Sequence, residues 1–68
     1  MKTNNSIISL EEAYQKLFKF AELTGLVIDG KYIDGIPSGT EENINLFYYW
    51  EDYLGYPSSE EVNLILNK

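Results

Sequence analysis

The residues best suited to chemistry in this sequence form one aromatic and acidic stretch, residues 46–56. Six of these eleven residues are aromatic, and the only charged ones are Glu51 and Asp52. Tyrosine and tryptophan combine rigid contact area with a polar tip, and they are enriched among the residues that contribute most to binding between proteins. We therefore predict a protein-binding site made of Tyr49, Trp50, Glu51, Asp52, Tyr53 and Tyr56.

Catalysis has little support, and we predict that the protein is not an enzyme and has no catalytic residue. The sequence contains no histidine and no cysteine, so the commonest general base and the thiol nucleophile are missing. Four adjacent carboxylate pairs occur: Glu11–Glu12, Glu41–Glu42, Glu51–Asp52 and Glu60–Glu61. Three of these pairs stand where helices are expected to begin, a position that favours acidic residues because of the helix dipole.

A metal site would have to be built from Asp29, Asp34 and Glu41, two of which precede a glycine. The spacing of a calcium-binding EF-hand loop is absent, as is the glycine-rich pattern of a phosphate-binding loop. Aspartate followed by glycine is also what tight turns require. We therefore expect no metal and no cofactor.

The charge of the chain is uneven. The formal net charge is −6, and no lysine stands between Tyr32 and Asn67, where seven carboxylates lie. A negative field repels phosphate backbones, so we expect no direct binding to nucleic acid. The same field favours a basic protein partner, although acidity also serves simply to keep a small protein in solution.

The length and hydropathy of the chain set its broad class. Its 68 residues predict one domain, 1–68, with residues 1–6 as a loose polar tail. No run of 18 apolar residues is present, so we expect no membrane span. The lack of cysteine is consistent with a cytoplasmic location, which is the location we predict.

The predicted fold class is α+β and mainly helical, in the order helix, short β-hairpin, helix, short helix. Ser9 caps a helix over residues 10–24, with Glu12 in capping-box position and Gly25 as the stop. Two β-prone triplets, residues 26–28 and 31–33, flank Asp29-Gly30, a pair typical of a type I′ turn. An all-α domain of three helices, with an ordered loop in place of the hairpin, is the alternative.

A second helix is predicted from about residue 41 to Leu54, capped by Thr40 or, alternatively, by Ser38. Gly55 and Pro57 end it, and Ser58 caps a third helix. Because the second helix is apolar on most sides, we expect it to be the central one, with Ile44 and Tyr48 in the core. Tyr49 and Tyr53 are expected to be partly exposed, with Trp50 as a further candidate for partial exposure. The residues predicted to be buried are Leu17, Phe18, Ala21, Val27, Phe47, Leu54, Ile65 and Leu66.

These features predict a small acidic protein that binds another protein. The hypothesis we favour is an inhibitor that blocks a basic or nucleic-acid-binding enzyme, in the manner of immunity proteins, antitoxins and phage anti-defence proteins. This hypothesis rests on physical properties that the chain shares with such inhibitors: small size, one-sided acidity and aromatic side chains. The alternative is a structural or assembly protein that forms a homodimer through the aromatic second helix.

Overall fold

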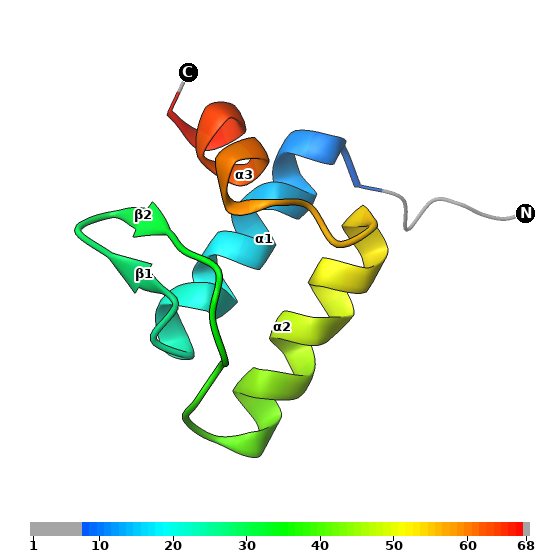
Figure 1. Ribbon diagram of the computed structural model, residues 1–68. Helices are drawn as coiled ribbons and strands as arrows, with labels where there is room; N and C mark the ends of the chain where they lie inside the picture. Colours follow the sequence, from blue (N-terminus) through cyan, green and yellow to red (C-terminus); the bar gives the residue numbers. More distant parts are fainter. Residues whose placement is uncertain (1–7, 68) are drawn as a thin grey trace, which may run out of the picture.

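A computed structural model describes residues 8–67, which form three helices and one β-hairpin (Figure 1). The elements in chain order are α1 (Leu10–Leu23), β1 (Val27–Ile28), β2 (Lys31–Tyr32), α2 (Glu41–Leu54) and α3 (Ser59–Leu66). The predicted α+β architecture is therefore confirmed over its all-α alternative. The predicted tail, residues 1–6, lies outside the described residues.

Each helix begins at a side-chain cap of the kind that the sequence predicts. The hydroxyl oxygen of Ser9 accepts a hydrogen bond from the N–H of Glu12 at 3.1 Å, and that of Ser58 accepts one from Glu61 at 3.2 Å. For α2 the cap is Thr40, which accepts from the N–H of Asn43 at 3.2 Å. The alternative cap, Ser38, is wrong, because its hydroxyl points to the carbonyl oxygen of Thr24 instead, at 3.5 Å.

The first two helices end in the same way, with a Schellman motif built on a left-handed glycine. Gly25 follows α1 with φ +80°, and Gly55 follows α2 with φ +83°. In each case the next residue donates its N–H five positions back, Leu26 to Ala21 at 2.7 Å and Tyr56 to Glu51 at 2.7 Å. These bonds satisfy carbonyl groups that a helix end otherwise leaves unpaired.

The hairpin turns at Asp29-Gly30, as predicted. Both residues have positive φ, 54° and 75°, which is the conformation of a type I′ turn. Val27 pairs with Tyr32 and Ile28 with Lys31, so the strands are two residues long rather than the three expected. Because side chains alternate along a strand, this register places Val27 and Tyr32 on the same face of the hairpin.

The central element is α1, which corrects the expectation that α2 would be central. Among the described residues the backbone of α1 approaches every other element, whereas that of α2 approaches only α1 (Figure 1). The fully buried Ala13 and Ala21 leave room on α1 for close neighbours. Three of the eight apolar side chains of α2 are tyrosines, whose hydroxyl groups tolerate water.

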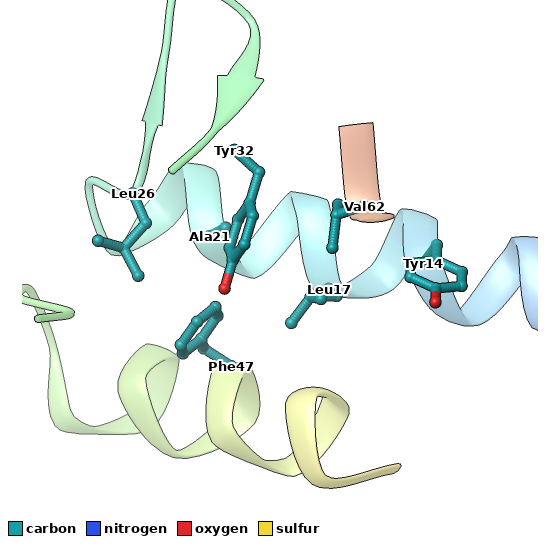
Figure 2. Close-up of a cluster of buried hydrophobic side chains, with 7 residues drawn as sticks. All are labelled: Tyr14, Leu17, Ala21, Leu26, Tyr32, Phe47 and Val62. Atoms are coloured by element: carbon teal, nitrogen blue, oxygen red, sulfur yellow. The ribbon is translucent and has the colours of Figure 1, made fainter. Parts of the chain in front are cut away.

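The core lies where α1, α2, α3 and the hairpin meet (Figure 2). Its buried members are Tyr14, Leu17, Ala21, Leu26, Tyr32, Phe47 and Val62. Tyr32 extends from the hairpin to Phe47 on α2, with their ring centroids 6.2 Å apart, and so joins two elements whose backbones do not approach each other.

The predicted core is therefore correct only in part. Leu17, Ala21 and Phe47 are buried, as expected. The other predicted members pack against the core but are only partly buried: Phe18, Val27, Leu54, Ile65 and Leu66. Ile44 is half-buried, and Tyr48, which we expected in the core, is 45% exposed. The error for Tyr48 follows from the position of α2, which has a neighbour on one side only.

The loop before α2 is fixed to the end of α1. The N–H of Ser38 donates to the carbonyl oxygen of Thr24 at 3.1 Å. Gly39 has φ +118°, and a Cβ at this position would lie 3.2 Å from the carbonyl oxygen of Leu23. Glycine is thus required here, because it allows the loop to pass close to the α1 backbone and to start α2 at a fixed place.

Asn63 on α3 holds the hairpin in place. Its side-chain oxygen accepts the N–H of Tyr32 at 3.1 Å, and its side-chain N–H donates to the carbonyl oxygen of Tyr32 at 2.9 Å. Both backbone groups of a buried residue are thereby satisfied by a single amide. The hairpin and α3, 31 positions apart in sequence, form one unit with the core.

Candidate protein-binding site

Three aromatic side chains of α2 pack against one another, and we call them the ring cluster: Tyr49, Trp50 and Tyr53. The centroids of Tyr49 and Trp50 are 5.1 Å apart, and those of Trp50 and Tyr53 are 5.3 Å apart, both with the rings close to edge-on. Tyr49 and Tyr53 are 6.4 Å apart, one helical turn along α2. These distances are typical of favourable aromatic pairs.

The members of the ring cluster differ in burial. Tyr49 is 57% exposed and Tyr53 is 46% exposed. Trp50 is half-buried and packs against the core. Trp50 therefore forms the base of the cluster, with one part of its indole on the core and the two tyrosine rings against it. Such support holds the exposed rings in defined positions.

Asp52 and Tyr56 lie near each other at the end of α2. Both side chains are exposed, Tyr56 by 66%. The negative charge of Asp52 raises the pKa of the Tyr56 phenol. Asp52 follows Tyr49 by three residues within α2, a spacing that makes side chains neighbours on a helix surface, so Asp52 lies beside the ring cluster.

Tyr56 also has an unusual backbone. Its φ is +56°, a left-handed conformation that costs a residue other than glycine about 1–2 kcal/mol. Of the described residues other than glycine, only Asp29 in the hairpin turn shares it. Aspartate adopts the left-handed backbone conformation fairly often, whereas a bulky residue such as tyrosine adopts it rarely.

Glu51 lies apart from the other predicted site residues. It is half-buried, and the hydroxyl of Tyr32 donates to its carboxylate at 3.4 Å. Burial raises the pKa of Glu51, the hydrogen bond from Tyr32 lowers it, and the charge of Asp34 raises it. The structure thus leaves Tyr49, Asp52, Tyr53 and Tyr56 exposed on α2 and its exit, keeps Trp50 half-buried, and places Glu51 on the side that faces the hairpin.

Sequence reasoning missed Tyr32, which orients Glu51. Burial, followed by the charges of Glu51 and Asp34, raises the pKa of the Tyr32 phenol, which therefore stays protonated as a hydrogen-bond donor. The sequence does contain a signal for the burial of Tyr32. A type I′ turn at Asp29-Gly30 pairs Tyr32 with Val27, a residue predicted to be buried, so both side chains lie on the same face of the hairpin. That face packs on α1, against which both strands lie.

The charges of the described residues are divided between elements. The lysines are Lys16 and Lys19 on α1 and Lys31 on β2. The charged side chains of α2 are all acidic: Glu41, Glu42, Glu51 and Asp52. The ring cluster therefore lies on a helix that carries only negative charge.

A surface depression of about 300 Å³ lies elsewhere, lined by residues of α1, the hairpin turn and α3. Its lining includes Phe18, Lys19, Glu22 and Leu66, with opposite charges side by side. It is open and has no side chain from α2, so it does not contribute to the candidate site.

Comparisons of the chain with protein-family models, with curated proteins and with solved structures give no match. Within residues 8–67, no three side chains of His, Cys, Asp or Glu are grouped so that they could hold a metal ion. In the same part of the chain, none of the helices combines the length and the apolar character needed to cross a membrane.

Proposed function

We propose that the protein binds another protein through the ring cluster together with Asp52 and Tyr56, and that it acts as an inhibitor of a basic or nucleic-acid-binding enzyme. The observation that carries the proposal is the ring cluster itself, in which the two exposed tyrosine rings pack on a half-buried Trp50. The predicted cytoplasmic location stays part of the proposal.

Preorganisation supports a binding role for the rings. An exposed tyrosine that must be ordered on binding loses rotamer freedom, which weakens the complex. Tyr49 and Tyr53 already rest on Trp50, so less of that freedom remains to be lost. Exposed rings on a supported base are the kind of residue that dominates binding energy in protein interfaces.

Charge supports a basic partner. Asp52 is exposed beside the rings, and α2 carries no cation that would neutralise it. Opposite charge on the partner speeds the encounter, and like charge slows it. An enzyme that acts on nucleic acid presents such a positive surface, and an acidic protein seated there excludes the phosphate backbone.

Self-association is the alternative, and the charge of α2 disfavours it. Two copies that paired through the ring cluster would bring Asp52 of each close to the acidic α2 of the other, with no lysine on that helix. Like charges across an interface are destabilising. Analytical ultracentrifugation of the purified chain at micromolar concentration distinguishes the two, because a stable dimer would favour the assembly role.

Tyr53→Ala is expected to weaken partner binding by about 2 kcal/mol, or roughly 30-fold in Kd, without unfolding the domain. The reason is the loss of an exposed ring whose position is fixed by Trp50. The measurement is affinity capture from an extract of the cell that makes the protein, followed by binding kinetics with the captured enzyme and an assay of its inhibition.

Tyr48→Ala is the matched control for that experiment. Tyr48 is on the same helix and has nearly the same exposure, 45% against 46%, but it lies against Phe47 outside the ring cluster. The Tyr48→Ala variant should still capture the partner. If Tyr53→Ala also binds normally, or if its binding defect matches a loss of thermal stability, the ring cluster is not the binding site.

Asp52→Lys is expected to act on the rate of association. Reversing this exposed charge should reduce the association rate constant by several-fold at low salt and leave the dissociation rate less affected. The difference from the original protein should shrink as salt is raised, because screening shortens the range of the interaction. Stopped-flow mixing at two salt concentrations measures it, and an association rate that is independent of salt would exclude steering by Asp52.

A further inference from the structure

The two Schellman motifs of this fold differ in the residue that follows the glycine. After α1 this residue is Leu26, which is 5% exposed and does not have positive φ. A hydrophobic residue packed against the helix at this position is a common feature of the motif. After α2 the residue is Tyr56, which is 66% exposed and has φ +56°.

Nothing that Tyr56 contributes to the fold requires a tyrosine. Its N–H bond to Glu51 is a backbone interaction that glycine or asparagine would make equally well. Its ring is mostly in solvent, so it adds little to the core. Glycine, and to a lesser degree asparagine, would adopt the same left-handed backbone with less strain.

The next residue makes the strain harder to relieve. Pro57 is buried and precedes Ser58, the cap of α3. A residue before proline is restricted in its backbone conformations, and Pro57 cannot move without disturbing the start of α3. The fold therefore fixes the backbone of Tyr56 from both sides and keeps this residue at the end of α2, close to Asp52.

Strained positions that persist without a structural need are concentrated at functional sites. We infer that residue 56 is a tyrosine for binding rather than for folding, and that the Tyr56–Asp52 pair at the edge of the ring cluster receives a cationic side chain, arginine above all, of the basic partner. This inference rests on the proposed function and adds the chemistry that the site recognises. A guanidinium group would pair with the Asp52 carboxylate and lie on an aromatic face.

The first test is stability, which needs no partner. Tyr56→Gly and Tyr56→Asn should each raise Tm, by about 4 °C or more for Tyr56→Gly, because the strain is relieved. Tyr49→Gly is the matched control, an exposed tyrosine inside α2, and it should lower Tm because glycine is unfavourable in a helix. An unchanged or lower Tm for both substitutions of Tyr56 would overturn the inference that the fold does not require this tyrosine.

The second test is recognition of the cation, with a hexa-arginine peptide as the probe. Trp50 is the only tryptophan of the chain, so its fluorescence reports directly on the ring cluster. The peptide should change this fluorescence in a saturable way. Tyr56→Asn and Asp52→Asn should each weaken its binding at least threefold, and a hexa-lysine peptide should bind more weakly than hexa-arginine.

Two controls separate specific recognition from general attraction between opposite charges. Tyr48→Asn alters an exposed tyrosine outside the cluster, and Glu42→Gln removes one acidic charge at the far end of α2. Both should bind hexa-arginine nearly as tightly as the original protein. If Glu42→Gln weakens binding as much as Asp52→Asn, or if the peptide does not bind, recognition by the Tyr56–Asp52 pair is wrong.

The outcomes also separate this inference from the proposed function. Loss of partner capture in Tyr53→Ala, with full binding in Tyr56→Asn, would keep the ring cluster as the binding site and reject Tyr56 as a recognition residue. Normal capture by both variants would reject the proposed site as a whole. A Tm that rises together with weaker binding in Tyr56→Asn is the result that supports the inference.

Discussion

Phe47→Ala is expected to destabilise the domain by about 3–5 kcal/mol, enough to leave a large part of a small protein unfolded at 25 °C. Phe47 is 1% exposed and is the only fully buried side chain of α2. It packs against the ring of Tyr32, so its loss removes an apolar contact between α2 and the hairpin and leaves the Tyr32–Glu51 hydrogen bond as a link between them. Urea titration followed by circular dichroism measures the change.

Two variants serve as comparisons for Phe47→Ala. Phe47→Leu keeps most of the buried volume and should cost less than half as much, because the remaining cavity is smaller. Tyr48→Ala, on the adjacent exposed residue, should change the free energy of unfolding by about 1 kcal/mol or less. A loss below about 1 kcal/mol for Phe47→Ala would mean that α2 packs on α1 through another face.

Asn63→Ala is expected to cost about 2–4 kcal/mol, although it removes only a small polar side chain. Its amide is the partner of both the N–H and the carbonyl oxygen of Tyr32, and each buried group left without a partner costs about 1–3 kcal/mol. Hydrogen exchange should also become faster at the Tyr32 amide. This exchange rate reports on the Asn63–Tyr32 contact itself, whereas the free energy of unfolding reports on the whole domain.

Asn63→Asp and Asn67→Ala make this prediction specific. Aspartate can still accept the Tyr32 N–H but has no N–H to donate to the carbonyl oxygen, so its effect should be intermediate near neutral pH. The side chain of Asn67 bonds to the backbone at the exposed end of α3, and its removal should have a small effect. Equal effects of Asn63→Ala and Asn67→Ala would show that the Tyr32 contact contributes nothing particular.

The elements of this fold could be predicted from sequence because their signals are local. Ser9, Thr40 and Ser58 cap their own helices within four residues, and Asp29-Gly30 fixes the turn by its own backbone preference. Such features depend little on the rest of the molecule. Their positions along the chain were therefore predicted to within one or two residues.

The arrangement of the elements could not be predicted in the same way. Counting apolar residues made α2 appear central, but the count treats an exposed tyrosine as if it were a buried leucine. The turn places Tyr32 on the same face as Val27, but the partners of its side chain and backbone, Phe47, Val62 and Asn63, are all distant in sequence. No local pattern encodes a contact across 31 residues, so the core was predicted only where helical periodicity alone decides it, as at Leu17 and Ala21.

In the candidate site, too, local features could be predicted from sequence and features that depend on the rest of the fold could not. Tyr49, Trp50 and Tyr53 could be grouped by helical spacing, and the structure does bring their rings together. Glu51 was grouped with them because it is adjacent in sequence, yet 100° of helix rotation per residue turns it toward Tyr32. The left-handed backbone of Tyr56 has no sequence signal, because tyrosine is among the residues least expected there.

The amide of Asn63 also bears on the behaviour of the protein at high concentration. A strand at the border of a sheet offers unpaired N–H and carbonyl groups to which a strand of another chain can add, a common start of aggregation. On β2 those groups belong to Tyr32, and Asn63 already occupies both. A single side chain of α3 thus takes the place of the missing neighbouring strand and ends the sheet on that side.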